Sequence, residues 1–222
     1  MARKGDGGRR QRQRRQQVQY EELDKYPVMP PHAFARIVRD LRTLNIIYQV
    51  IEPPLTKKEE EVRSEIMDIF IQALTADIDE IDANPELYLR AAMDQIIKSY
   101  RLKINKKSRS KIFYYLKRDL IGYGRMDVLM NDANVEDVSL DGTNIPIFAY
   151  HRKFESVETT IAWPDDVELE SYVIKLAQRC GKHISVAKAL AGCNIDGWFS
   201  NRHEVGSRSI DTRFHILYPP IP

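Results

Sequence analysis

The spacing of hydrophobic residues changes along this chain and divides it into segments. Residues 26–31 contain three prolines, which predict an extended entry into the folded part. Residues 33–38 and 46–51 are rich in β-branched and aromatic side chains and flank a polar turn at Arg39 and Asp40. This pattern predicts a small hairpin ahead of the first helix.

Three stretches with helical periodicity follow the hairpin. The first begins at Thr56, which forms a capping box with Glu59. The second has Asn84 as its cap and Pro85 in the first helical position, and the third covers residues 108–119. Each stretch has one apolar face and one charged face, so the three faces can cover one another. We expect a small three-helix bundle.

The pattern becomes strand-like after the glycines at 122 and 124, which we interpret as a domain boundary. Residues 135–140, 145–150 and 154–159 predict three strands in an antiparallel meander. Asp165 and Asp166 then precede a helix with one apolar stripe, which ends near Cys180. This helix is expected to pack on the sheet, with Gly181 as its carboxy-terminal stop.

These elements predict an α+β fold. Its second part is a compact α/β unit, a meander packed on a helix. The expected organisation is a disordered tail over 1–27, the hairpin and bundle over 28–120, the α/β unit over 121–188, and a final tail over 189–222.

Composition places this protein among cytoplasmic proteins. The 222 residues are 43% hydrophobic and 30% charged, which suits one or two modest cores. The chain contains neither an apolar run long enough for a membrane span nor the apolar stretch of a signal peptide. Its two cysteines predict a reducing compartment.

The amino terminus differs in charge from the rest of the chain. Residues 1–19 contain seven Arg or Lys residues and one Asp, whereas the whole chain carries a net charge of only +2. A segment so basic and so poor in apolar residues should be disordered. The tail is expected either to act as a solubilising segment or to make weak contacts with anionic lipid or nucleic acid.

Five segments in the same order resemble the amino-terminal half of the archaeal type II/IV secretion ATPases, which drive pili, archaella and protein export. They are PPHAFARI (30–37), YQVIEPPLTKKEEE (48–61), IGYGRMDVLMNDANVEDVSLDG (121–142), AYHRKFESVETTI (149–161) and VIKLAQRCGKHISVA (173–187). The resemblance implies a helical portion and an α/β portion ahead of a RecA-like motor domain that uses ATP and magnesium. It also implies a homo-hexamer that is peripheral to the membrane through a polytopic platform protein.

The motor domain itself is expected to be missing from this chain. The nearest match to a P-loop is the segment at 180–183, but Leu176 stands where glycine is needed and His183 follows Lys182. We therefore predict no catalytic, nucleotide-binding or metal-binding residues, and no ATP hydrolysis by this chain alone.

Four basic residues match family positions and are candidates for a subunit or domain interface. They are Arg152, Lys153, Arg179 and Lys182. A solvated role, or compensation of a helix dipole, is the alternative for each of them.

The resemblance stops after Lys188. With suitable codons, reading one nucleotide later can yield PLLDATLTDGSR and then STRGSTFYIR, which resemble the family's continuation. We therefore expect a frameshift near Lys188 or Ala189, with a divergent but genuine ending as the alternative. Residues 189–222 should form a poorly ordered tail, because the prolines in 218–222 cannot donate hydrogen bonds to a sheet.

Two functions from different classes remain open. The chain is a truncated subunit of a secretion, pilus or archaellum motor, or it is a stand-alone adaptor that regulates such a motor. Nucleic-acid binding through residues 1–19 is a weaker third reading.

Overall fold

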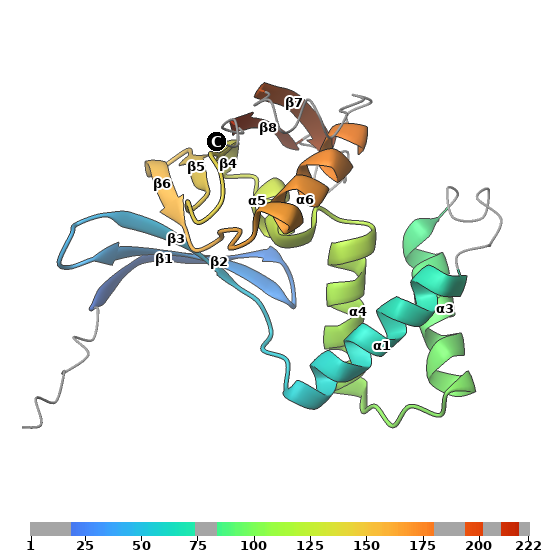
Figure 1. Cartoon of the computed structure of the whole chain (residues 1–222). Coiled ribbons are helices and arrows are strands. Elements are labelled where there is room, and N and C mark those ends of the chain that lie inside the picture. The colour runs from blue at the N-terminus through green and yellow to red at the C-terminus, as the bar shows by residue number, and fades with distance from the viewer. Residues whose placement is uncertain (1–18, 74–83, 180–193, 202–209, 218–222) are drawn as a thin grey trace, which may run out of the picture.

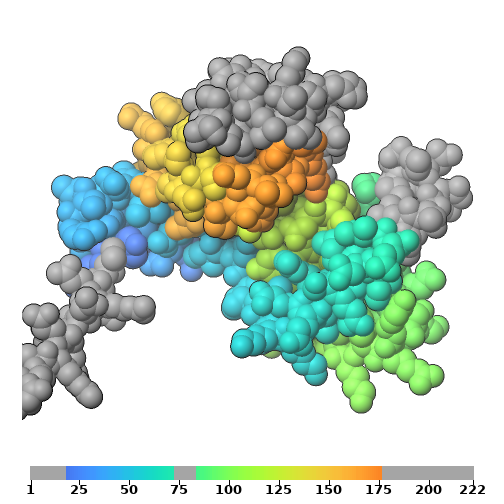
Figure 2. Space-filling view, in the orientation of Figure 1, coloured from blue at the N-terminus to red at the C-terminus, as the bar shows by residue number. Residues whose placement is uncertain are grey.

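The computed structural model describes residues 19–73, 84–179, 194–201 and 210–217 (Figure 1). It confirms the α+β fold. A mixed sheet and a helical bundle form two lobes, and the bundle projects from the sheet in the space-filling view (Figure 2).

The described strands form one eight-stranded sheet in the order β1-β2-β3-β6-β5-β4-β8-β7. The strands are β1 (Tyr20–Met29), β2 (Ala33–Asp40), β3 (Ile46–Ile51), β4 (Val135–Leu140), β5 (Phe148–His151), β6 (Glu155–Thr159), β7 (Asn194–Asn201) and β8 (Ile210–Leu217). The helices are α1 (Lys57–Ala73), α3 (Pro85–Ser99), α4 (Lys106–Leu120), the short 3-10 helix η1 (Gly124–Met126), α5 (Asp127–Met130) and α6 (Asp166–Arg179).

The prediction of a disordered segment over 1–27 is wrong for its last part. Residues 20–27 belong to β1, which pairs antiparallel with β2. Leu23, Tyr26 and Val28 pack against the buried core of the sheet, and this burial stabilises the strand. Pro27 is tolerated because β1 lies at the edge of the sheet. Residues 1–18 lie outside the described part.

The predicted hairpin exists as the antiparallel pair of β2 and β3, but it belongs to the sheet. Strand β3 runs parallel to β6, with Ile47 opposite Glu158 and Tyr48 opposite Thr159. The sequence pattern places this hairpin in one unit with the helices, because they follow it directly along the chain. The partner strand lies more than 100 residues later, and a pattern read along the chain does not reveal such a pairing.

The predicted helical bundle is confirmed in α1, α3 and α4. Both predicted caps form, since the Thr56 amide donates to Glu59 Oε2 at 2.8 Å and the Leu87 amide donates to Asn84 Oδ1 at 3.0 Å. The third helix begins two residues earlier than predicted, after the cap Asn105. The bundle core contains Ile66, Phe70, Leu89, Met93, Ile96, Ile112, Phe113 and Leu116.

The predicted meander is confirmed in β4, β5 and β6, although β5 begins later than expected at Phe148. Helix α6 packs on this part of the sheet through Leu169, Val173 and Leu176. Trp163 is fully buried there and lies 4.7 Å from the ring of Tyr172. Cys180 and Gly181 lie outside the described residues.

The prediction of a loose tail after residue 188 is wrong for two segments. The backbone of β8 runs parallel to β4, and β7 pairs antiparallel with β8, so both segments extend the sheet (Figure 1). Both segments contain aromatic and β-branched residues. These residue types favour strands whether or not the segment arose by a frameshift. Residues 218–222 lie outside the described part, and the frameshift stays a prediction.

None of the described helices is long and apolar enough to cross a membrane.

Replacing Asn84 tests the cap of α3. Asn84→Ala removes the acceptor for the Leu87 amide and should lower the free energy of unfolding by about 1 kcal/mol, whereas Asn84→Gly should lower it by only a few tenths. Urea unfolding of both variants measures the difference. Equal effects of the two substitutions would show that the cap contributes nothing.

Candidate docking site at the junction of bundle and sheet

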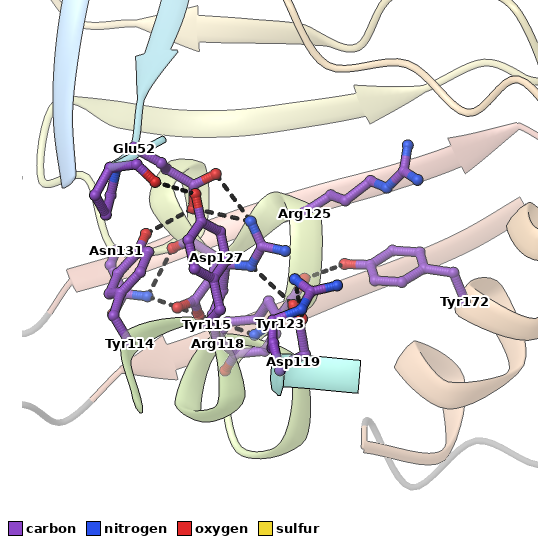
Figure 3. Close-up of polar contacts among 12 residues, drawn as sticks. Glu52, Tyr114, Tyr115, Arg118, Asp119, Tyr123, Arg125, Asp127, Asn131 and Tyr172 are labelled. Atoms are coloured by element: carbon purple, nitrogen blue, oxygen red, sulfur yellow. Dashed lines mark hydrogen bonds and ion pairs between the residues drawn. The ribbon is translucent and has the colours of Figure 1, made fainter. Parts of the chain in front are cut away.

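The bundle is joined to the sheet by Arg118 near the end of α4. Its Nη1 donates to both carboxylate oxygens of Glu52, at 3.0 and 2.8 Å, and its Nε donates to Asp119 Oδ1 at 2.8 Å (Figure 3). Only 13% of the Arg118 side chain is exposed. Burial opposes its charge, but the carboxylates of Asp119 and Glu52 more than compensate and raise its pKa.

Two tyrosines of α4 complete this junction. Tyr114 donates its hydroxyl to Glu52 Oε1 at 2.6 Å, and Tyr115 donates to the carbonyl of Pro53 at 2.9 Å. Burial and the Glu52 carboxylate raise the pKa of both hydroxyls, that of Tyr115 to about 12. The guanidinium of Arg118 also lies 4.7 Å from the Tyr115 ring centroid. The segment between β3 and α1 is therefore fixed to α4 by charge and by hydrogen bonds.

Helix α6 is fixed to the same region through residues 122–127. The Asp127 side chain accepts the amide of Tyr123 at 2.9 Å, and the Tyr172 hydroxyl donates to the Tyr123 carbonyl at 3.0 Å (Figure 3). A Cβ atom at Gly122 would lie 2.5 Å from Asp127 Oδ1 and 2.8 Å from the backbone carbonyl oxygen of Arg118, so any other residue would force the backbone to shift. The segment interpreted as a domain boundary is thus a packed connection between α4, α5 and α6.

A groove of about 650 Å³ lies beside this junction. It is lined by the β1–β2 turn, by one face of α3 and of α4, and by Arg118 and Asp127. Its apolar part includes Met93 and Phe113, which also belong to the bundle core.

Most of the groove's charged residues are already paired. Lys117 donates to Glu86 at 2.5 Å, and Arg109 pairs with Asp94. Arg90 lies over the Phe113 ring at 4.1 Å. Alternating ion pairs around apolar side chains suit a segment of protein better than a small, highly charged ligand. No group of three or more His, Cys, Asp or Glu residues in the described ranges could hold a metal ion.

A second polar cluster lies inside the sheet around Asp132, which is 2% exposed. Asp132 Oδ2 accepts the hydroxyls of Tyr26 and Tyr48, both at 2.6 Å, and Oδ1 accepts the amide of Asn134 at 2.9 Å. Burial and the carboxylate raise the pKa of both tyrosines. The cluster connects β1 and β3 to the turn before β4.

His151 completes this cluster, and its contacts fix its tautomer. Its Nδ1 accepts the amide of Lys153 at 3.1 Å, so the proton lies on Nε2, which is 3.0 Å from the Tyr26 hydroxyl. That hydroxyl accepts from His151 and donates to Asp132. Burial lowers the pKa of His151, although the Asp132 and Asp24 carboxylates oppose this effect.

The two predicted interface residues whose side chains are described, Arg152 and Lys153, do not line this groove. Arg152 and Lys153 lie in the β5–β6 turn, 56% and 63% exposed, and pair with Glu136 and Asp24. Arg179 is described by its backbone only, and Lys182 lies outside the described residues. An interface role for these four residues stays a prediction.

The sequence reading missed Glu52, Arg118 and Asp132. Each stands in a pattern that is usually solvated: a Glu before two prolines, an Arg on the charged side of a helix, and an Asp in a turn. The one available signal was the position of Glu52 and Asp132 inside family-like segments.

The chain resembles three uncharacterized proteins of Methanocaldococcus jannaschii. It is 39% identical to MJ1288 over 151 residues, which are 68% of this chain and 58% of MJ1288. It is 34% identical to MJ0900 over 97 residues, and 42% identical to MJ0781 over 50 residues. These regions are 17% and 6% of the relatives, so the chain spans only part of each protein that it matches. No family model matches the chain.

Arg118→Met tests the junction. The substitution leaves Glu52 without its cation and Asp119 with only Arg63, at 3.5 Å, so it should lower the free energy of unfolding by about 2 to 4 kcal/mol, somewhat less than for a fully buried pair. Arg118→Met combined with Glu52→Gln should recover part of this loss. The control Arg90→Met, at a 56% exposed position, should lower it by about 1 kcal/mol or less. Equal losses in the two single variants would contradict this role for Arg118.

The buried His151 predicts a pH dependence of stability. Its pKa in the folded protein is lowered, so the unfolded chain binds the proton more readily, and stability falls as the pH drops below the ordinary value of 6.5. His32 has a lowered pKa from burial and adds in the same direction. Urea unfolding between pH 7.5 and 5.5 should therefore show a smaller decline for His151→Gln than for the unchanged chain. An unchanged decline in that variant would mean that His151 is not the group that titrates.

Proposed function

We propose that this chain is a non-catalytic, amino-terminal part of a hexameric secretion-motor ATPase subunit. The observation that supports it best is that family-like segments far apart in the sequence meet in one buried network. Tyr48, Asp132 and His151 come from three of those segments: Tyr48 donates to Asp132 directly, and the Tyr26 hydroxyl links His151 to Asp132. Contact in the folded chain between residues of three family-like segments supports the proposal that these segments act as one unit.

The lengths of the relatives support a modular role. In MJ0900 and MJ0781 the matching region is a small fraction of a much longer protein. A unit of this kind contributes binding and positioning, while ATP and magnesium belong to the motor domain of the family. In the proposed function the chain hydrolyses no ATP alone and enters a homo-hexameric ring. The ring lies in the cytoplasm, where a polytopic platform protein in the membrane holds it.

The groove beside Arg118 is the proposed contact with the rest of the motor. Its apolar floor and alternating charges suit a protein segment from a neighbouring domain or subunit. Because the junction fixes α4 to the sheet, the groove is preorganised, which reduces the entropy lost on binding.

A stand-alone adaptor is the second candidate function. It is favoured by MJ1288, in which the matching region is more than half of the whole protein. An adaptor would bind an intact motor ring from outside, whereas a truncated subunit would take the place of one ring member.

Mixing the purified chain with the secretion ATPase encoded in the same genome tests the proposal. We expect no ATP hydrolysis by the chain alone, and we expect it to elute with the ATPase in size-exclusion chromatography. Arg109→Glu, in the groove, should weaken this association by roughly tenfold or more, because it reverses a charge that the groove lining presents to a bound segment. Arg39→Glu, in β2 and outside the groove lining, is the matched control, because Arg39 is likewise paired with a carboxylate.

The outcomes separate the two candidates. Inhibition of the ATPase by substitution into its ring supports the truncated subunit, and binding to an intact, active ring supports the adaptor. Hydrolysis by the chain alone, or the absence of any association, overturns the proposal.

A further inference from the structure

Basic residues gather at one end of the helical bundle. Helices α1 and α4 begin at this end, α3 ends there, and the α3–α4 loop runs between them (Figure 1). Lys58 of α1 and Lys103 of the loop line one cavity of about 310 Å³, which places the two segments side by side. We call the following set the basic end: Lys57, Lys58, Lys98, Arg101, Lys103, Lys106 and Lys107.

Internal ion pairs do not account for the basic end. In the same stretch Arg109 pairs with Asp94, and Lys111 pairs with Glu59 at 2.7 Å. Among the described side chains, no carboxylate lies within 4.0 Å of any of the seven basic-end cations. Glu60 and Glu61 on α1 reduce the positive charge at this end but leave the cations in excess.

Helix stability does not account for two of these cations either. Lys106 and Lys107 open α4, which has no acidic residue in its first turn, although the helix dipole disfavours cations there. An external anion would compensate for charges that the fold itself does not favour.

The side chains between these cations favour a lipid surface. Tyr100 is 55% exposed, and Arg101 and Lys103 are exposed beside it, while Leu102 and Ile104 anchor the loop against the bundle core. A cluster of exposed basic residues beside an exposed tyrosine suits the headgroup region of a bilayer. Tyr100 is the one largely exposed aromatic residue in residues 85–120, and bound single-stranded nucleic acid needs several stacking rings.

We propose that the basic end binds directly to a membrane surface that contains anionic lipids. This contact goes beyond the proposed function, in which a platform protein holds the motor at the membrane. It is also separate from any contact of residues 1–19. Lysine and arginine side chains would bind lipid phosphates, while Tyr100 inserts at the level of the headgroups.

Vesicle sedimentation with the full-length chain tests this proposal. We expect binding to vesicles of phosphatidylcholine with about one third phosphatidylglycerol, no binding to phosphatidylcholine alone, and release by added salt. The variant Lys103→Gln, Lys106→Gln, Lys107→Gln should bind roughly tenfold more weakly or worse. The control Arg39→Gln, Arg152→Gln, Lys153→Gln removes the same charge from exposed positions elsewhere and should change binding by about twofold at most.

Three outcomes overturn the proposal. They are equal binding to both vesicle types, equal weakening in the two triple variants, and preferential binding of duplex or single-stranded DNA at the same phosphate concentration. A weakening shared by both variants would assign the binding to general charge or to residues 1–19. Since these tests need no ATPase, they fail or succeed independently of the proposed function.

A second measurement does not depend on the folding of the triple variant. In Tyr100→Trp the new indole occupies an exposed position, so the substitution leaves the core intact. Its fluorescence should shift to shorter wavelength with the anionic vesicles and stay unchanged with phosphatidylcholine. An unchanged spectrum with both vesicle types would also overturn the proposal.

Discussion

The contact between Arg118 and Glu52 holds the two lobes of this protein together. A mostly buried guanidinium requires anionic partners, and Glu52 and Asp119 provide them in the connection to α1 and at the end of α4. This requirement fixes where the chain leaves the sheet and where the bundle stands against it. The groove lies between the β1–β2 turn and the bundle, so its width depends on how far the bundle stands from the sheet.

The network around Asp132 does the same inside the sheet. A carboxylate that is 2% exposed is stable there because two tyrosine hydroxyls and a backbone amide satisfy its oxygens. It links the hairpin to the later strands and makes one rigid support out of segments from both halves of the chain. Surfaces on such a support suit docking: the groove lies between the β1–β2 turn and the bundle, and the basic end lies on the bundle.

The reliable predictions were those set by neighbours in the sequence. The caps at Thr56 and Asn84 and the strand at Val135–Leu140 depend on residues a few positions apart, and the structure contains all of them. Strand β1 was missed because its first half is acidic and lies beside the basic tail. The pairings of β3 with β6 and of β4 with β8 were also missed, since both join distant segments. Of the candidate site, only the family-like segments that contain Glu52 and Asp132 were visible in advance.

The sequence by itself determined the local elements, because hydrophobic period, caps and turns act over one or two helical turns. It also determined the excess of cations over residues 98–107, since charge is a property of composition. Only the tertiary structure decided that Arg118, Glu52 and Asp132 are buried and paired, and that Arg152 and Lys153 remain at the surface. The physical reason is that burial and electrostatic pairing depend on distance in space, which the folded chain sets between residues far apart in sequence.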